Sequence, residues 1–414
     1  MSRRPPLSRE PQTAVVDGFT HGGEGVVRLE GKAVFVPGAL PGETVVVRVV
    51  EDRKNWARAD LVDVVEASPD RVEPPCPYVP DCGGCDLQHA TPDAQRRLKT
   101  RVVVEQLQRL GRLEDPPVRD CRPVGPDTGY RTHAQMHAAP DGRLGFRREG
   151  SHEVVPIDQC LVMTPASQSV RDQVGDGTGA AEVQLRANSS KGSAAAVLHP
   201  GPGPLQIPDG AFDLSLAQPD GSLARLRGEA VLAEEVAGFT FRFDASSFFQ
   251  VNTGGAEAIV AEVMDVLGDV SGQLVWDLYA GVGLLSLPLA RAGADVVAVE
   301  GHKPATEWLR RNAEAADLQV GIQTADVGTF VRAETADPPD AVVLDPPRTG
   351  AREDVVRAVA GHAPGTVVYV ACDPAALARD VKTFADLGYR LVEARPLDLF
   401  PMTHHVEVIA HLTR

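Results

Sequence analysis

The sequence lacks any run of about 20 uninterrupted apolar residues, the length that a helix needs to cross a lipid bilayer. A membrane-spanning helix is therefore not expected, and neither is a membrane partner. Residues 1–6 carry charges and prolines, and no apolar stretch follows them, so we predict no signal peptide. The chain has 414 residues, enough for two or three domains with a sizeable core.

Cysteine is also scarce, with six residues in the whole chain. So few cysteines cannot form the dense disulfide framework that small secreted domains use. We therefore predict reduced thiols in a cytoplasmic protein, which leaves the cysteines free for metal binding or catalysis.

Positive charge is in deficit, because 41 lysines and arginines stand against 57 aspartates and glutamates, a formal net charge of -16. This balance argues against a nucleic-acid partner. Net charge does not exclude local basic surface, however. Ordinary solvation explains each basic residue alone, whereas the following set favours RNA binding: Arg96, Arg97, Lys99, Arg101, Arg131, Arg143, Arg147 and Arg148.

The first two parts of the chain differ in their pattern. Residues 1–70 show short alternating segments between Gly and Pro turns, which predicts a small β-barrel of the oligonucleotide-binding type. Residues 71–245 are expected to form a central α+β region. Its helix is predicted over 91–113, capped by Thr91 or Asp93, and antiparallel strands are predicted from about residue 129 onward.

The third part, residues 246–414, alternates strands and helices. This order predicts a doubly wound α/β sheet with right-handed crossovers, closed by a late pair of strands. The protein is thus expected to be multidomain. The strands of the third part are predicted at 274–277, 295–299, 341–345, 366–371, 389–395 and 406–412.

A glycine turn follows the first of these strands. Gly281 and Gly283 allow positive φ and let the backbone approach a ligand, and a helix is expected over 284–290. Glu300 ends the next strand at about the 20-residue offset of a ribose-binding acid. Because Ser286 replaces a third glycine and no P-loop lysine is present, the pattern favours a nucleoside without phosphates, such as S-adenosylmethionine.

Two further strands end in a functional group beside a proline. Asp345 follows one apolar run and Cys372 follows the next. The carboxyl ends of parallel strands form the ligand-binding edge of such sheets. A lone cysteine more often only packs, but this position and its neighbours make Cys372 a candidate nucleophile.

Three cysteines lie on a loop rich in Gly and Pro. Cys76, Cys82 and Cys85 have a C-x5-C-x2-C spacing that can converge on one centre. A closed metal site needs a fourth thiol, for which Cys121 and Cys160 are the candidates. Tetrahedral sulfur suits either an iron–sulfur cluster or zinc.

Several ordered motifs together resemble the RNA uracil-5 methyltransferases, over about residues 15–414. The resemblance implies a class I methyltransferase sheet and a TRAM domain over the predicted barrel, in which Arg53, Lys54 and Arg58 would contact phosphates. The motifs are Phe248-Phe249-Gln250-Val251-Asn252, Asp277-Leu278-Tyr279-Ala280-Gly281-Val282-Gly283, Asp345-Pro346-Pro347-Arg348, Cys372-Asp373-Pro374 with Leu377-Ala378-Arg379-Asp380, and His405-Val406-Glu407.

The resemblance also assigns roles to single residues. Cys372 would add to C6 of uracil, and Glu407 would remove the C5 proton. The residues that would bind S-adenosylmethionine are Gln250, Tyr279, Gly281, Glu300, Asp326 and Asp345. Leu284 departs from the family, since many relatives have Asn there, so one polar cofactor contact is lost or supplied otherwise.

The family also has members with a [4Fe–4S] cluster. Their pattern implies Cys160 as the fourth ligand beside Cys76, Cys82 and Cys85, with zinc as the alternative occupant, and leaves Cys121 as a free thiol. Four ligands leave no position open for substrate, so the centre is expected to be structural.

The expected reaction is methylation of C5 of one uridine in structured RNA. Ribosomal RNA is favoured over transfer RNA, and no obligate protein partner is inferred. One alternative is an amino-group methyltransferase, whose acid-Pro-Pro turn usually ends in an aromatic residue where this chain has Arg348. Another is a non-catalytic RNA-binding protein, against which the pair Cys372 and Glu407 argues.

Overall fold

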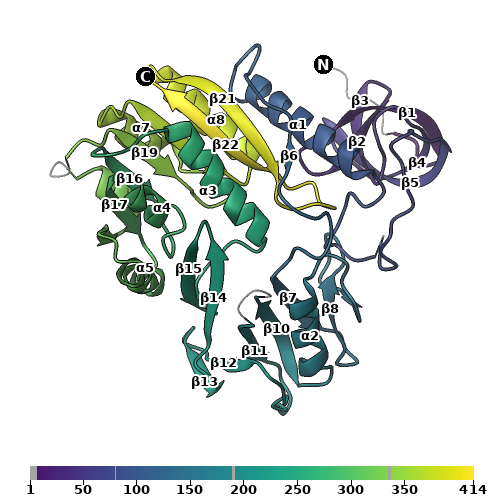
Figure 1. Ribbon diagram of the computed structural model, residues 1–414. Coiled ribbons are helices and arrows are strands. Elements are labelled where there is room, and N and C mark those ends of the chain that lie inside the picture. The colour runs from purple at the N-terminus through teal and green to yellow at the C-terminus, as the bar shows by residue number, and fades with distance from the viewer. Residues whose placement is uncertain (1–6, 80, 189–191, 334–336) are drawn as a thin grey trace.

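The computed structural model describes residues 7–79, 81–188, 192–333 and 337–414. These residues form a closed barrel, a seven-stranded sheet, an eight-stranded sheet and one separate hairpin (Figure 1). The segment 1–6, for which no signal peptide is predicted, lies outside the described residues. No described helix is both long and apolar enough to span a membrane.

The N-terminal strands form a closed barrel, as predicted, and the structure gives their order as β1-β2-β3-β5-β4. Its alternate side chains point inward, and buried valines such as Val27, Val34 and Val45 fill the interior. The strands are β1 (Gln12–Phe19), β2 (Glu24–Leu29), β3 (Lys32–Pro37), β4 (Thr44–Asp52) and β5 (Trp56–Glu66).

The long helix of the central region, α1, spans Pro92–Arg109. The Thr91 hydroxyl accepts a hydrogen bond from the Ala94 N–H, so Thr91 rather than Asp93 is the cap. The helix ends four residues before the predicted boundary, and Arg112 beyond it has a left-handed φ of 60°.

A seven-stranded sheet follows, in the order β13-β12-β11-β10-β7-β8-β9, with helix α2 (Pro165–Val174) packed on it. It is antiparallel as expected, except that β11 and β12 run parallel. Its strands are β7 (His133–Ala138), β8 (Leu144–Arg147), β9 (Val154–Pro156), β10 (Ala180–Ala187), β11 (Ala194–Pro200), β12 (Asp213–Ala217) and β13 (Leu223–Arg227).

The C-terminal sheet has the order β18-β17-β16-β19-β20-β22-β21-β6. The first five strands are parallel, and β22 lies antiparallel between β20 and β21, which confirms the predicted late strand pair. The strands are β16 (Leu274–Leu278), β17 (Asp295–Glu300), β18 (Gly321–Thr324), β19 (Ala341–Leu344), β20 (Thr366–Ala371), β21 (Arg390–Asp398), β22 (Glu407–Thr413) and β6 (Arg122–Pro123).

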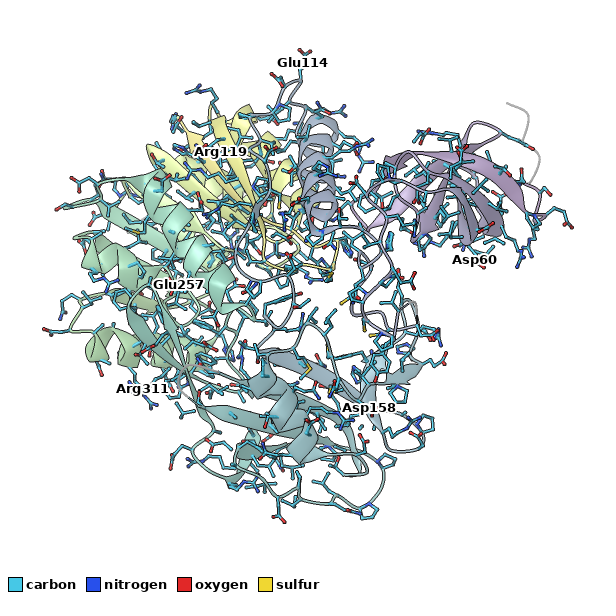
Figure 2. The ribbon with its side chains drawn as sticks, turned by 45° about the vertical axis from the view of Figure 1, so that its right-hand side comes forward. Asp60, Glu114, Arg119, Asp158, Glu257 and Arg311 are labelled. Atoms are coloured by element: carbon cyan, nitrogen blue, oxygen red, sulfur yellow. The ribbon has the colours of Figure 1, made fainter. Side chains whose placement is uncertain are left out.

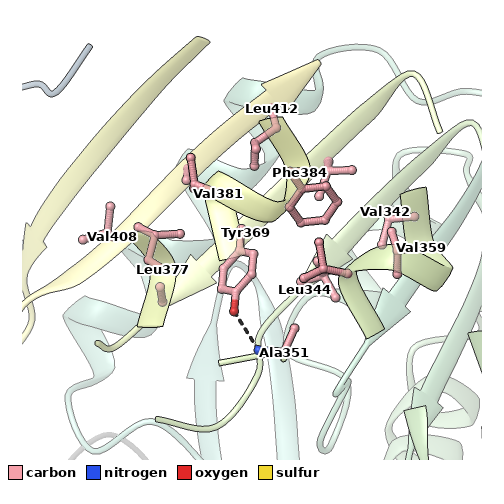
Figure 3. Close-up of a cluster of buried hydrophobic side chains, with 14 of the residues drawn as sticks. Val342, Leu344, Ala351, Val359, Tyr369, Leu377, Val381, Phe384, Val408 and Leu412 are labelled. Atoms are coloured by element: carbon pink, nitrogen blue, oxygen red, sulfur yellow. Dashed lines mark hydrogen bonds between the residues drawn. The ribbon is translucent and has the colours of Figure 1, made fainter. Parts of the chain in front are cut away.

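Helices cover both faces of this sheet and enclose two apolar cores. One core gathers Tyr369, Phe384 and Leu412 with residues of α1, and Figure 3 shows its centre. The expected helix after the glycine turn is α4, which begins two residues late at Ser286. The helices are α3 (Thr253–Leu267), α4 (Ser286–Arg291), α5 (Lys303–Ala315), α6 (Val327–Val331), α7 (Glu353–Gly361) and α8 (Pro374–Asp386).

Elements that precede residue 246 also take part in this C-terminal body. Helix α1 packs against α8, and the two-residue strand β6 extends the sheet beside β21. The hairpin of β14 (Val231–Val236) and β15 (Phe239–Asp244) contributes Phe241 and Phe243 to the second core. The central and C-terminal parts therefore share their hydrophobic cores.

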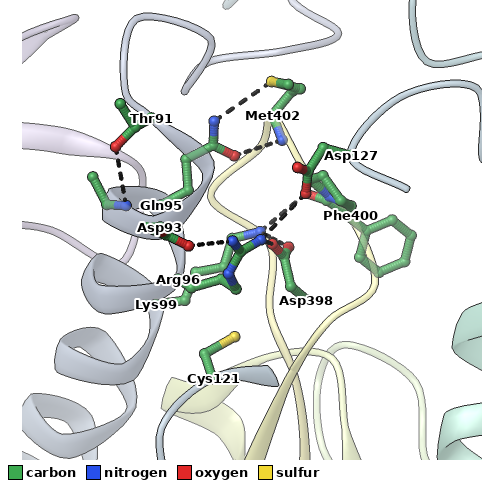
Figure 4. A network of polar contacts seen from close by, with 12 residues as sticks. Thr91, Asp93, Gln95, Arg96, Lys99, Cys121, Asp127, Asp398, Phe400 and Met402 are labelled. Atoms are coloured by element: carbon green, nitrogen blue, oxygen red, sulfur yellow. Dashed lines mark hydrogen bonds and ion pairs between the residues drawn. The ribbon is translucent and has the colours of Figure 1, made fainter. Parts of the chain in front are cut away.

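A buried ion pair fixes α1 to the end of β21. Lys99 donates to the carboxylate of Asp398 and to the Phe400 carbonyl, and both charged side chains are 1% exposed (Figure 4). The sequence placed Lys99 in a basic surface that would hold RNA. That expectation is wrong, because the side chain crosses the interface between α1 and β21 instead.

Candidate active site

The candidate catalytic residues meet at the carboxyl edge of the C-terminal sheet. Cys372 directly follows β20 and Asp345 directly follows β19, while Glu407 is the first residue of β22. Ala371 pairs with Val408 in an antiparallel ladder, so the next pair along, Cys372 and Glu407, lies opposite one another. Side chains of an opposite pair share one face of a sheet at about 5 Å between Cβ atoms.

The electrostatics of this pair are dominated by burial. The pKa of Cys372 is raised to about 12, first by burial and then by the negative charges of Glu407 and Asp345, against the opposing effect of Arg348. Burial also raises the pKa of Glu407 well above its usual range, with Asp345 adding to the effect and Arg348 opposing it. The Cys372 thiol is therefore protonated at neutral pH in the free protein, and the Glu407 carboxyl keeps its proton to a higher pH than an exposed glutamate does.

The glycine turn after β16 has the conformation that the sequence predicts. Gly281 and Gly283 have φ of 56° and 100°, and Tyr279 also adopts a positive φ, of 67°. A Cβ on Gly281 would meet nothing within 4 Å, which leaves open space beside this backbone. The Glu300 carboxylate accepts hydrogen bonds from the N–H groups of Gly281, at 3.0 Å, and His302, at 2.7 Å, and so ties the turn to the end of β17.

The other two predicted cofactor residues differ in their surroundings. Gln250 is buried, next to Phe249, which stacks on Phe243 in the core. Asp326 is exposed and caps α6, where its Oδ1 accepts from the Thr329 N–H and hydroxyl. This capping role occupies one carboxylate oxygen of Asp326, and it explains an aspartate at this position even if the residue binds no ligand.

Leu284, where many relatives have Asn, packs its side chain against the second apolar core. Helix α4 begins only at Ser286, and the turn before it makes no side-chain cap. A leucine at this position therefore contributes packing and no polar group.

Two charged residues near this edge were not among the predicted site residues. Asp277 in β16 is 1% exposed and accepts a hydrogen bond from the Ser286 hydroxyl, while its Oδ1 is buried without a hydrogen-bond partner. Burial raises its pKa to about 6, and Glu300 adds to the effect. Asp277 could have been predicted, because an acid inside an otherwise apolar strand is unusual. The second residue is the exposed Arg348, which ends the motif Asp345-Pro346-Pro347-Arg348.

The four candidate metal ligands lie near one another. The pKa of Cys85 is raised to about 12, mainly by burial, and electrostatic interaction with the nearby Cys160, Cys82 and Cys76 adds to the effect. All six cysteines of the chain are free thiols, and a pocket of about 660 Å³ lies beside Cys76 and Cys160. Within the described ranges, no three His, Cys, Asp or Glu side chains are already arranged to hold a metal ion.

Cys121, the leftover cysteine, is apart from this group. It is buried beside α1 and the Lys99–Asp398 pair, as Figure 4 shows. Burial raises its pKa to about 12, and Asp398 adds to the effect. Its environment is that of a packed core thiol.

Most of the basic residues expected to form an RNA surface are neutralised by acids. Ion pairs engage Arg96, Arg97, Lys99, Arg101, Arg143 and Arg148, and in the barrel Arg53 and Arg58. Acidic residues are spread over the surface, as the labelled Asp60, Glu114, Asp158 and Glu257 of Figure 2 illustrate.

Three other arginines lie around the candidate site. Arg348, Arg352 and Arg379 are exposed, and none of them pairs with a carboxylate within 4.0 Å in the part of the chain that the structure describes. Arg348 and Arg352 flank the turn after β19, and Arg379 is on α8, the helix that follows Cys372. Arg348, Arg352 and Arg379 thus place positive charge beside the nucleophile, and none of the three was among the basic residues predicted to bind RNA.

Comparison with known proteins gives family matches at both ends of the chain. A TRAM domain model matches residues 8–62, which the barrel occupies. The model described as tRNA (Uracil-5-)-methyltransferase matches residues 336–414, the segment with Cys372 and Glu407.

Curated relatives match over nearly the full length. A protein described as an uncharacterized RNA methyltransferase from Streptomyces avermitilis is 39% identical and covers 95% of each chain. The 23S rRNA (uracil(1939)-C(5))-methyltransferase RlmD of Shewanella amazonensis is 36% identical, over 95% of this chain and 94% of its own.

A solved structure matches over the same length. The tRNA (uracil-54, C5)-methyltransferase of Pyrococcus abyssi, in complex with S-adenosyl-L-homocysteine, superimposes with a TM-score of 0.78 at 27% identity. The match covers 97% of this chain and 100% of that one. With this agreement in sequence, fold and order of parts, the chain belongs to the RNA uracil-5-methyltransferase family and is an RNA (uracil-5-)-methyltransferase.

Proposed function

We propose that the protein methylates C5 of a uridine in 23S ribosomal RNA through a covalent bond between Cys372 and C6 of the base. The observation that carries this proposal is that Cys372 and the buried Glu407 lie one position beyond the Ala371–Val408 pair of β20 and β22, where the charge of Glu407 acts on the thiol. A thiol and a general base on one face of a sheet are the two groups that the reaction requires.

The chemistry explains why both groups are needed. C5 of uracil is a poor nucleophile because the ring carbonyls withdraw electron density. The thiolate of Cys372 forms a bond to C6, and the C5–C6 π electrons move onto the C4 oxygen as an enolate. C5 then has the electron density to accept the methyl group that S-adenosylmethionine supplies from its positively charged sulfur.

Release of the product requires the opposite movement of electrons. The Glu407 carboxylate takes the proton from C5, the C5–C6 double bond forms again, and the C6–S bond breaks to return the Cys372 thiolate. Burial raises the pKa of Glu407, which makes its carboxylate a stronger base than an exposed one. The thiol must lose its proton before it attacks, and Arg348 favours that loss by lowering the Cys372 pKa.

The S-adenosylmethionine site is proposed at the glycine turn. Gly281 borders the open backbone, Glu300 at the end of β17 suits the ribose hydroxyls, and Tyr279 would pack against the methionine part or the adenine. Asp326 would accept from the adenine amino group, while Gln250 and Asp345 complete the set. S-adenosyl-L-homocysteine in the Pyrococcus abyssi structure supports this ligand class.

The target base must leave its stack to reach Cys372, at a cost of a few kcal/mol. Phe248 is 70% exposed although its neighbours Phe249 and Gln250 are buried. Phe248 lies two residues before Gln250, a proposed cofactor contact, and an exposed aromatic ring there is suited to stack on an extruded base. Arg348, Arg352 and Arg379 would contact the flanking phosphates, which position RNA without identifying its sequence.

The names of the relatives support ribosomal RNA as the substrate. Three Shewanella relatives of 34–36% identity are 23S rRNA (uracil(1939)-C(5))-methyltransferases. Transfer RNA is the second candidate, because the Pyrococcus abyssi structure is of a tRNA methyltransferase.

The decisive experiment uses 23S rRNA and tRNA fragments that carry 5-fluorouridine at the candidate position, incubated with the protein and S-adenosylmethionine. Fluorine cannot leave as a proton does, so the Cys372 adduct should persist as a band that survives denaturation. We expect this band with the rRNA fragment, and its loss in Cys372→Ala.

The other outcomes are equally informative. An adduct with tRNA alone would move the substrate to transfer RNA. Methyl transfer to ordinary RNA without any adduct would contradict the covalent mechanism and favour amino-group methylation.

The four clustered thiols are proposed to hold a [4Fe–4S] cluster, with zinc as the alternative. Cys76, Cys82, Cys85 and Cys160 are partly buried free thiols, and an all-sulfur ligand set suits both occupants. Protein purified without oxygen should be brown and contain iron, and Cys160→Ser should lose both properties. Bound zinc without iron would contradict the cluster.

A further inference from the structure

The tip of the N-terminal barrel touches the catalytic segment directly. Nε2 of His21, in the turn between β1 and β2, donates a hydrogen bond of 2.9 Å to Oδ2 of Asp373. Asp373 is the residue after Cys372, and the two partners are 33% and 27% exposed. A residue of the TRAM barrel thus contacts the neighbour of the proposed nucleophile.

Asp373 has a second bond that fixes the helix after the nucleophile. Its Oδ1 accepts from the Ala376 N–H at 2.6 Å, which makes it the N-cap of α8. Burial would raise the pKa of Asp373, but the bonds from His21 and Ala376 outweigh it and hold the pKa below its usual range. The carboxylate is therefore ionised and shared between the barrel and the start of α8.

The same barrel tip also touches the segment that leads to Glu407. A Cβ on Gly23, which has a φ of 81°, would lie 3.0 Å from the His404 Cβ and 3.2 Å from Oδ2 of Asp86. The rings of His21 and His404 are 6.5 Å apart, edge to face. The tip therefore fits closely against both segments that present the candidate catalytic pair.

Asp86 fixes the second of these segments. It directly follows Cys85, and its carboxylate accepts from the backbone N–H and from Nδ1 of His404. The N–H groups of Asp86 and Leu87 donate to the Met402 carbonyl. The segment before Glu407 is thus held on one side by the cysteine loop and on the other by the barrel tip.

The turn itself is preorganised by Thr20. Its hydroxyl accepts from the N–H groups of Gly22 and Glu24, and its carbonyl accepts from the Gly23 N–H. His21 is consequently presented by a hydrogen-bonded turn, which limits the conformational entropy lost in making the contact.

We infer that His21 is a positioning residue for the methyl-transfer reaction: through Asp373 it sets the start of α8 and thereby the orientation of Cys372. This inference rests on the proposed covalent function. The barrel would then position the nucleophile in addition to contacting RNA. Any displacement of the barrel when RNA binds would be passed to Cys372 through Asp373. Misplacement of a reacting group by about 1 Å can cost up to about a hundredfold in rate.

The test measures adduct formation with 5-fluorouridine RNA at saturating RNA, together with the RNA dissociation constant. For His21→Ala we expect the adduct rate to fall about tenfold while the dissociation constant stays within about twofold. His21→Gln should restore most of the rate, because its amide nitrogen lies near the place of Nε2. His152→Ala, which removes an exposed histidine of the central region, is the matched control.

Each outcome decides the inference. An adduct rate in His21→Ala equal to that of the unmodified protein would overturn it. A weaker RNA affinity with an unchanged rate at saturation would also overturn it, and would make His21 a plain RNA contact. If the unmodified protein forms no adduct, the proposed function fails instead. Thermal melting of both His21 variants should remain unchanged and so separate positioning from folding.

Discussion

At the scale of single residues, Glu407 offers the sharpest test of the proposed sequence of steps. In Glu407→Gln the adduct can form and accept the methyl group, but nothing removes the C5 proton. We expect a denaturation-resistant complex with ordinary uridine RNA, and turnover reduced by about 10²–10⁴-fold. Gel electrophoresis of the denatured reaction measures the complex. Normal turnover in this variant would assign the base to another group.

The pH dependence follows from Arg348. The reactive forms of Cys372 and Glu407 are deprotonated, and both pKa values are raised by burial, so kcat/KM should increase with pH through and above neutrality. Arg348 lowers both pKa values. In Arg348→Ala both pKa values rise, and the ascending limb of the pH profile should move to higher pH.

The control is Arg348→Lys, which keeps the positive charge. It should keep the limb near its original position, even if RNA binding weakens. If the ascending limb of kcat/KM against pH does not move in Arg348→Ala, this charge does not act on the catalytic pair.

Candidate site residues could be predicted from the sequence where they lie within a short local motif. Cys372 and Asp345 stand at strand ends, and the structure places both at the predicted sheet edge. The contact of His21 with Asp373 joins residues 352 positions apart. No periodicity or spacing encodes such a contact, because it depends on how the barrel docks.

At the scale of elements, strands with strong apolar runs were predictable and weak ones were not. β16, β19 and β20 are buried on both faces and appear as continuous apolar segments. β18 was missed because it is a short, largely exposed edge strand, and β6 because it has two residues. The attachment of the hairpin β14–β15 to the second core also has no local signal.

The contact between α1 and β21 leads to a stability prediction. Lys99→Ala leaves the buried Asp398 without its hydrogen-bonded cation and with only the Arg96 guanidinium, 3.8 Å away, which should destabilise the protein by up to about 3–5 kcal/mol. The double variant Lys99→Met, Asp398→Leu should recover much of this loss, because it removes both charges. Arg101→Ala is the control on the same helix, since its exposed pair with Glu105 should contribute no more than about 1 kcal/mol.

Chemical denaturation followed by circular dichroism measures these differences as shifts of the transition. Equal effects of Lys99→Ala and Arg101→Ala would contradict the importance of the buried pair.

At the scale of the whole molecule, a protein with a formal net charge of -16 must bind RNA, itself a polyanion, through local positive charge. The ion pairs consume most basic residues of the expected set, whereas Arg379 is free beside the candidate site. Arg379→Ala should weaken binding to all RNA sequences alike and reduce the salt slope of the binding constant by about one. Binding measured over a series of salt concentrations tests this. An unchanged slope would place the RNA backbone elsewhere, and Arg225→Ala, in an exposed ion pair with Glu229, is the control.

The buried pair of Lys99 and Asp398 also has a consequence for how the protein is made. The two residues are 299 positions apart. A ribosome adds about 5–20 residues per second, so α1 waits on the order of 15–60 s for its partner carboxylate. During this interval its lysine and the apolar side chains of Val103 and Leu107 have no completed interface. During synthesis, the nascent chain therefore exposes the apolar face of α1, which is prone to aggregation until β21 has been synthesised.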